Sequence, residues 1–185
     1  MDMRARILKT ISPLTIFFGK IQSPESEMPD MSFERLVSVI NPGDVLLSRR
    51  TYSLSNLGIP GFYKHAVLYV GNGKIIEAIG KGVQEVSLAR WIYTYDHAVC
   101  LRPLFASKEG IDGACKFATD QKGKKYDYEF SPGIQSFYCS ELVYYSYIYS
   151  MPESPFTLRK SLGVDTVVPE DFLKASSKFK QVWKS

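Results

Sequence analysis

The sequence predicts an α+β fold in which a central antiparallel sheet packs against helices. Short apolar runs gather between residues 45 and 102, and turn signals rather than helical stretches separate them. Gly71-Asn72-Gly73 joins two of these runs as in a β-hairpin. Runs with helical spacing follow at 108–122 and from residue 139 onward. With 185 residues, the chain can bury a core as one domain without disulfides or metals.

Residues 1–31 are expected to form a helix or arm plus a linker, ahead of a domain at 32–185. Three basic residues precede a brief apolar stretch at 11–18: Arg4, Arg6 and Lys9. This stretch is too short to span a bilayer and lacks the cleavage pattern of a signal peptide. We expect it to pack on the domain, with weak association to an anionic membrane as the alternative. A cytoplasmic location is therefore favoured over an exported or peripheral membrane form.

The first half of the domain is expected to contain mainly strands. A short helix at 33–37 has a capping residue at Asp30 or Ser32. Asn41-Pro42-Gly43-Asp44 is a turn signal, and the apolar runs after it have no helical spacing. The expected strands cover 45–48, 64–70, 74–79, 82–86 and 97–102, with a capped helical turn at 87–91.

Helices are expected to dominate the second half. Small and apolar residues recur at helical intervals in 108–122, and again from Cys139 to about Ser150. Pro169 suits the first turn of a short helix, because its missing N–H has no intrahelical partner there. Residues 179–183 are expected to close the sheet as an edge strand.

Composition excludes several classes of function. The net charge of +4 comes without a long basic cluster, so direct nucleic-acid binding is not expected. The three cysteines are sparse, and no pair has zinc-ligand spacing, so neither a disulfide framework nor a metal or cofactor is expected. Cys100 and Cys115 are interpreted as small buried apolar side chains.

Cys139 is the candidate nucleophile, because it lies where a helix is expected to begin. Unpaired backbone N–H groups and the helix dipole stabilise a thiolate there. Such a thiolate needs a base and a group that orients the base. His65 in a strand and Glu77 in the return strand fit those roles, since a carboxylate inside an apolar run needs a partner. His97 is the alternative base, and a buried inert cysteine beside a core histidine is the alternative to any catalysis.

The hairpin register decides whether Glu77 can reach His65. A two-residue loop pairs Leu68 with Glu77, which places Glu77 on the face opposite His65. A three-residue loop with Gly73 in the left-handed bulge position pairs Val67 with Glu77 and places both side chains on one face. The hypothesis therefore requires the second arrangement or an equivalent bulge.

Three segments together carry a resemblance to a known family: Lys64 to Ala78, Tyr126-Asp127-Tyr128, and Tyr138-Cys139-Ser140-Glu141-Leu142-Val143. They resemble the circularly permuted branch of the NlpC/P60 superfamily, the YiiX/YebB-like papain-like cysteine hydrolases. The histidine precedes the cysteine here, which is the permuted order. The resemblance covers roughly 42–183. It implies a permuted papain-like fold with a central antiparallel sheet or small barrel packed on the cysteine-bearing helix.

The resemblance also implies a function. Cys139 would be the nucleophile, His65 the general base and acid, and Glu77 the orienting residue, cleaving amide bonds through an acyl-enzyme. The backbone N–H of Cys139 would be one oxyanion donor. The implied substrates are cell-wall-like peptides or small amino-acid amides. Relatives of lecithin retinol acyltransferase, which transfer lipid acyl groups, share the permuted layout but carry Asn-Cys-Glu-His at the cysteine. A non-catalytic binding domain is the third alternative.

Overall fold

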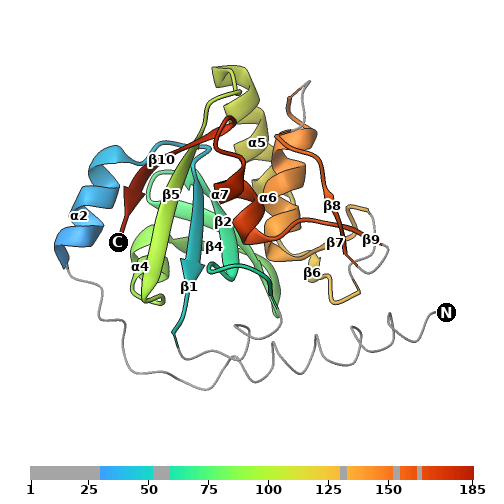
Figure 1. The fold of residues 1–185 in the computed structure, drawn as a ribbon, viewed down its shortest axis with the longest axis horizontal. Coiled ribbons are helices and arrows are strands. Elements are labelled where there is room, and N and C mark those ends of the chain that lie inside the picture. The colour runs from blue at the N-terminus through green and yellow to red at the C-terminus, as the bar shows by residue number, and fades with distance from the viewer. Residues whose placement is uncertain (1–29, 52–58, 130–132, 152–154, 162–163) are drawn as a thin grey trace.

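The computed structural model describes residues 30–51, 59–129, 133–151, 155–161 and 164–185. Within these ranges, a six-stranded sheet in the order β10-β5-β1-β2-β3-β4 forms the centre of the molecule (Figure 1). All neighbouring strands are antiparallel, and β10 is an edge strand, as predicted. The strands are β1 (Val45–Arg49), β2 (His65–Gly71), β3 (Lys74–Ile79), β4 (Gly82–Ser87), β5 (His97–Pro103) and β10 (Phe179–Lys184).

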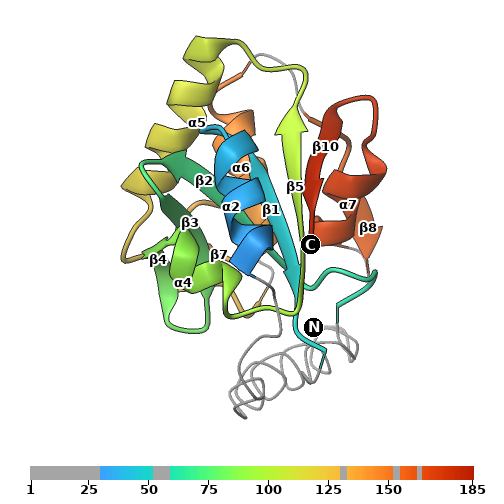
Figure 2. The ribbon, with the colours of Figure 1, turned by 90° about the vertical axis from the view of Figure 1, so that its left-hand side faces the viewer.

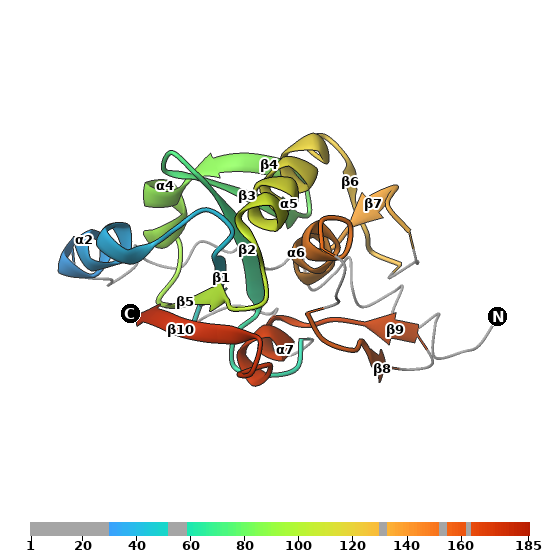
Figure 3. The ribbon, with the colours of Figure 1, turned by 90° about the horizontal axis from the view of Figure 1, so that it is seen from above.

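Helices cover both faces of the sheet (Figures 2 and 3). Because side chains alternate along a strand, Leu46 and Val67 contribute to one core cluster, and Leu47 and Ala66 to the other. The first cluster lies under α2 and α4, and the second lies under α5 and α6. The helices are α2 (Asp30–Val39), α4 (Leu88–Ile92), α5 (Lys108–Asp120), α6 (Cys139–Ile148) and α7 (Pro169–Lys174). The α+β prediction is confirmed.

The differences from the predicted elements are local. Helix α2 begins at Asp30 instead of near residue 33. Four short strands were not predicted, because two or three residues carry no periodicity. They are β6 (Lys125–Tyr126), β7 (Ser136–Phe137), β8 (Arg159–Ser161) and β9 (Val164–Thr166). The arm predicted for the N-terminus falls on residues 1–29, outside the described part, so it and the boundary at residue 32 stay predictions.

The β2–β3 hairpin combines features of the two predicted loops. It closes with a two-residue turn, in which Asn72 and Gly73 both have positive φ (52° and 68°) and Gly71 pairs with Lys74. The register then shifts between Tyr69 and Gly71, so that Leu68 pairs with Ile76. The bulge therefore lies before the turn and not at Gly73. If this register continues beyond Leu68, Val67 lies opposite Glu77. This is the pairing that the predicted three-residue loop required.

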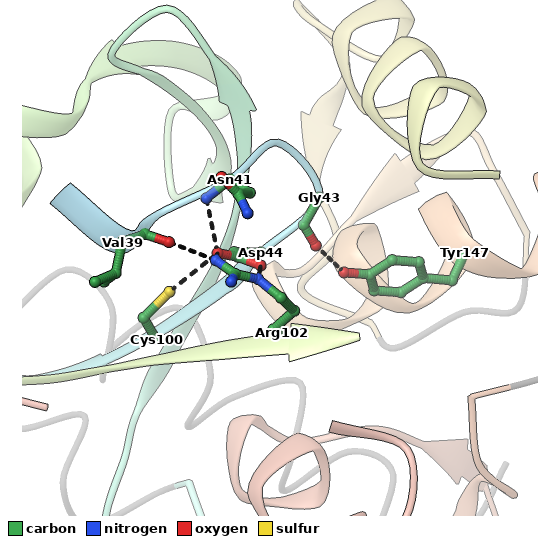
Figure 4. Close-up of polar contacts among 7 residues, drawn as sticks. All are labelled: Val39, Asn41, Gly43, Asp44, Cys100, Arg102 and Tyr147. Carbon is green, nitrogen blue, oxygen red and sulfur yellow. Dashed lines mark hydrogen bonds and ion pairs between the residues drawn. The ribbon is translucent and has the colours of Figure 1, made fainter. Parts of the chain in front are cut away.

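A buried carboxylate holds the turn before β1. Asp44 accepts hydrogen bonds from Arg102 Nε at 3.0 Å and Arg102 Nη2 at 2.7 Å (Figure 4). One residue earlier, the Gly43 carbonyl accepts a hydrogen bond from the Tyr147 hydroxyl. Tyr147 belongs to α6, so this contact ties the helix that begins at Cys139 to the start of β1.

Two cysteines were expected to be buried apolar side chains. Cys100 is fully buried, and its sulfur lies 3.6 Å from an Asp44 oxygen. The expectation is wrong for Cys115, which is only half-buried and lies 3.7 Å from the Tyr69 carbonyl oxygen. Its position on α5, near the bulged end of β2, leaves one side of the sulfur uncovered. Among the helices of the described ranges, none combines the length and apolar character needed to cross a bilayer.

Candidate active site

Cys139 is the first residue of α6, as the sequence predicted. The preceding residue, Tyr138, is extended (φ −90°, ψ 169°), so the chain turns into the helix at the cysteine. Glu141 accepts a hydrogen bond from the Tyr138 backbone N–H at 3.3 Å, which fixes this entry. The Cys139 side chain therefore lies at the positive end of the helix dipole, where an anion is stabilised.

His65 and Glu77 meet as the bulged register requires. His65 Nε2 lies 2.8 Å from Glu77 Oε2, and both side chains are buried. The other carboxylate oxygen, Oε1, accepts a hydrogen bond from Gln84 Nε2 at 2.7 Å. Gln84 lies directly opposite Glu77 in the β3–β4 ladder. One oxygen thus orients the imidazole while the other holds the carboxylate in place.

The remaining side of the imidazole faces the thiol. His65 and Cys139 lie close enough that each shifts the pKa of the other through hydrogen bonding and charge, and the backbone N–H of Ala66 also favours the thiolate. Because Glu77 engages Nε2, Nδ1 is the ring nitrogen left for Cys139. The three residues predicted from the sequence therefore form one continuous chain of contacts, from α6 through β2 to β3.

Electrostatics favours a charged pair at this site. Burial alone would lower the pKa of His65, but hydrogen bonds to Cys139 and Glu77 and their negative charges raise it to about 10. Burial alone would raise the pKa of Cys139, yet the His65 hydrogen bond and charge bring it below its ordinary value. Burial likewise opposes ionisation of Glu77, whose pKa the His65 and Gln84 contacts hold low. These shifts favour a thiolate facing an imidazolium over a neutral thiol beside a neutral imidazole.

Sequence reasoning missed two residues of this site. Tyr95 stacks on the His65 ring, with centroids 5.7 Å apart and planes 23° apart. It lies just before β5, and no local pattern connects it to His65. Gln84 was detectable in principle, because the tight turn between β3 and β4 places it opposite Glu77. A hairpin register drawn for that pair of strands would have found it.

The alternative base, His97, lies apart from the Cys139–His65–Glu77 contacts, and Ser140 lies beside Cys139. His97 is exposed, and its ring packs on Phe62 at 5.3 Å rather than on Cys139. In the β1–β5 ladder, His97 pairs with Arg49 at the end of the two strands. Ser140, beside the nucleophile, is buried with its Oγ 3.7 Å from the Cys139 sulfur.

The residue order and this geometry agree with a comparison of the chain with known families. A model described as the permuted papain-like amidase enzymes of the YaeF/YiiX (C92) family matches residues 39–182. The chain belongs to this amidase family. The matched range contains all three residues of the site and the whole six-stranded sheet except the last two residues of β10.

A solved structure supports the permuted papain-like amidase fold. The crystal structure of the metalloprotein YiiX from Escherichia coli O157:H7 superposes with a TM-score of 0.63. The alignment covers 78% of this chain and 97% of that one, at 24% sequence identity. This similarity confirms the predicted permuted fold. No curated protein matches the chain.

YiiX is described as a metalloprotein. Among the residues that the structure describes, no three His, Cys, Asp or Glu side chains converge as a metal-binding group. In the site, Glu77 already engages Nε2 of His65. The described side chains therefore do not fit a resident metal.

Proposed function

We propose that this member of the amidase family is a cysteine hydrolase that cleaves amide bonds through a covalent acyl-enzyme. Cys139 is the nucleophile, His65 the general base and acid, and Glu77 the residue that orients His65. The observation that carries the proposal is a single imidazole that lies 2.8 Å from a buried carboxylate and is close enough to the thiol to lower its pKa. That arrangement is the one that nucleophilic catalysis by a thiol requires.

The acylation step follows from the charged pair. The Cys139 thiolate attacks the amide carbonyl carbon, and the C=O π electrons move to the oxygen. The oxyanion lies near the Cys139 backbone N–H at the helix start, which is proposed as one donor. As the C–N bond breaks, the His65 imidazolium gives its proton to the leaving nitrogen. An amine departs and a thioester remains on Cys139.

Deacylation uses the same groups in reverse. Neutral His65 takes a proton from a water molecule, whose oxygen attacks the thioester carbonyl. Collapse of the second tetrahedral intermediate breaks the C–S bond and releases a carboxylic acid. The thiolate and the imidazolium are restored, so one water is consumed for each amide cleaved.

The proposed substrate is a small peptide or amino-acid amide, of the kind found in cell-wall peptides. Support comes from the amidase description of the family and from the Tyr138-Cys139-Ser140-Glu141 sequence, which differs from the Asn-Cys-Glu-His of lipid acyltransferases. Membrane association through the N-terminal segment stays a prediction that falls outside the described residues.

The test combines substrate turnover with thiol chemistry. A panel of dipeptides and amino-acid amides is incubated with the protein, and mass spectrometry follows amine release and an acyl adduct on Cys139. The same protein is alkylated with iodoacetamide across a pH series, and each cysteine is followed in its own peptide. Half-buried Cys115, whose pKa burial raises to about 11, serves as the internal reference. Equal profiles for Cys139 and Cys115, with no acyl adduct from any amide, would refute the proposal.

A further inference from the structure

A short segment near the C-terminus holds the chain just before the histidine. Glu170, in the first turn of α7, accepts two hydrogen bonds on one oxygen, from the backbone N–H of Phe62 at 3.0 Å and of Tyr63 at 3.3 Å. Gly61 passes so close that a Cβ built on it would lie 2.6 Å from the Glu170 Cβ, and its φ is +92°. Strand β2 begins with His65 directly after this turn.

Lys64 closes the same turn from the other side. Its ammonium donates to the carbonyl oxygens of Ile59 and Gly61, and its own backbone N–H donates to the Ser48 carbonyl at 2.9 Å. Burial and the charge of Arg49 lower the pKa of Lys64, and the negative charge of Glu170 partly opposes them. A carboxylate and an ammonium therefore hold the backbone that leads into β2 at a defined position on the sheet.

The same C-terminal segment also contacts the chain just before the cysteine. The backbone N–H of Val167 donates to the Tyr138 hydroxyl at 3.0 Å, and both residues are buried. Tyr138 is the residue directly before Cys139. Between these contacts, Asp171 accepts a hydrogen bond from the Val168 N–H at 2.8 Å and fixes the start of α7.

We propose that residues 167–170 form a strap that sets the position of His65 relative to Cys139, with Glu170 as its positioning residue. The inference rests on the proposed function. Cys139 and His65 come from distant parts of the chain, so tertiary contacts set the separation of thiol and imidazole. The strap bonds to Tyr138, directly before Cys139, and to Phe62 and Tyr63, three and two residues before His65. Small changes in such a separation have large effects on catalysis, because reacting groups must be held in near-attack geometry.

The test compares Glu170→Ala with Glu170→Gln. Alanine removes the acceptor for both N–H groups, whereas the single amide oxygen of glutamine can accept both bonds. Glu170→Ala is expected to lower kcat by about 10- to 100-fold with little change in KM, because the strap touches no reacting atom. It should also move the alkylation profile of Cys139 to higher pH. Glu170→Gln should restore both measurements to nearly the wild-type values.

Two further variants keep the test decisive. Tyr138→Phe removes the hydroxyl that accepts the Val167 N–H, at the other end of the strap. It should also shift the alkylation profile of Cys139 to higher pH, and it tests the strap even if Glu170→Ala does not fold. Ser107→Ala removes the N-cap that bonds Gly110 N–H on α5, so it should lower the Tm without moving the profile.

Three results would overturn the strap: a Glu170→Ala protein that only loses Tm, a Glu170→Gln protein as impaired as Glu170→Ala, or a Tyr138→Phe protein with the wild-type thiol profile. Failure of the proposed function is recognised separately. In that case the wild-type Cys139 itself would show an ordinary profile that does not depend on His65, whatever residue stands at 170.

Discussion

His65 Nε2 and Glu77 Oε2 lie 2.8 Å apart, although the hairpin that joins their strands closes with a two-residue turn. A regular hairpin of that kind would put the two side chains on opposite faces of the sheet. The register shift between Tyr69 and Gly71 inserts one residue into β2 and brings both onto the same face. The orientation of the imidazole therefore depends on a local irregularity of the sheet.

Gly71→Ala should damage both stability and the site. Gly71 has φ +93°, and a Cβ there would lie 3.3 Å from the Pro42 ring. The strained backbone should lower the free energy of unfolding by about 1–3 kcal/mol, measured by chemical denaturation. A relaxed bulge would also loosen the His65–Glu77 contact, so the alkylation profile of Cys139 should move to higher pH.

The matched control is Gly73→Asn in the turn itself. Gly73 has φ +68° with open space around its Cα, and asparagine tolerates a left-handed conformation. Its alkylation profile should equal that of the wild type. A Gly71→Ala protein with wild-type stability would show that the bulge is not strained by a side chain.

His65→Ala should make Cys139 an ordinary buried thiol. The imidazolium charge and hydrogen bond are what bring the pKa of Cys139 down against burial. The iodoacetamide rate of Cys139 at neutral pH should fall by about tenfold or more, because the thiolate is the reactive form. His97→Ala is the control, since that exposed ring packs on Phe62, and it should leave the rate unchanged. Equal effects of the two substitutions would contradict the assignment of His65.

Amide hydrolysis should follow a bell-shaped pH profile. The charged pair exists above the pKa of Cys139, which is lowered, and below that of His65, which is raised to about 10. Measured kcat/KM should therefore rise on the acid side below the ordinary range of a thiol and fall near pH 10. An alkaline limb near the ordinary pKa of histidine, about 6.5, would mean that Glu77 and Cys139 do not stabilise the imidazolium.

Gln84→Ala should weaken the orientation of the base without removing it. The lost hydrogen bond is to a charged carboxylate, worth about 1.5–3 kcal/mol, so kcat/KM should fall by about 10- to 150-fold. Gln84→Glu should be worse, because a second carboxylate would face Glu77. Gln181→Ala, at an exposed glutamine on β10, is the control and should keep wild-type kinetics. Wild-type kinetics in Gln84→Ala would remove Gln84 from the site.

Arg102→Ala should destabilise the fold while leaving the thiol chemistry of the folded protein unchanged. Asp44 is 1% exposed and would lose the guanidinium that compensates its charge. The Arg102 side chain is 31% exposed, so the free energy of unfolding should fall by about 2 kcal/mol, less than for a fully buried pair. Urea denaturation measures this free energy. Lys108→Ala breaks an exposed ion pair with Asp112 and should leave the unfolding midpoint nearly unchanged. Equal midpoints in the two variants would contradict a structural role for Asp44.

Local pattern was sufficient for most of the sheet and the long helices. The strands at 45–48 and 74–79 and the helix from Cys139 were predictable, because continuous apolar runs and helical spacing report burial directly. Strands β6 to β9 were not, because segments of two or three residues are too short to show a periodicity. The burial of Cys115 was overestimated for a related reason. A helical pattern does not show which residue lies at the edge of the face that packs on the sheet.

The sequence alone determined which side chains were available for chemistry: a cysteine at a helix start, a histidine in a strand, and a carboxylate in the next strand. These follow from residue types and local periodicity. Only the tertiary structure decided that they meet. The bulge before Asn72 and the Gln84 contact depend on how neighbouring strands pair, and the Tyr95 contact and the strap through Glu170 join residues far apart in the chain. Their positions depend on packing between elements, which no single segment encodes.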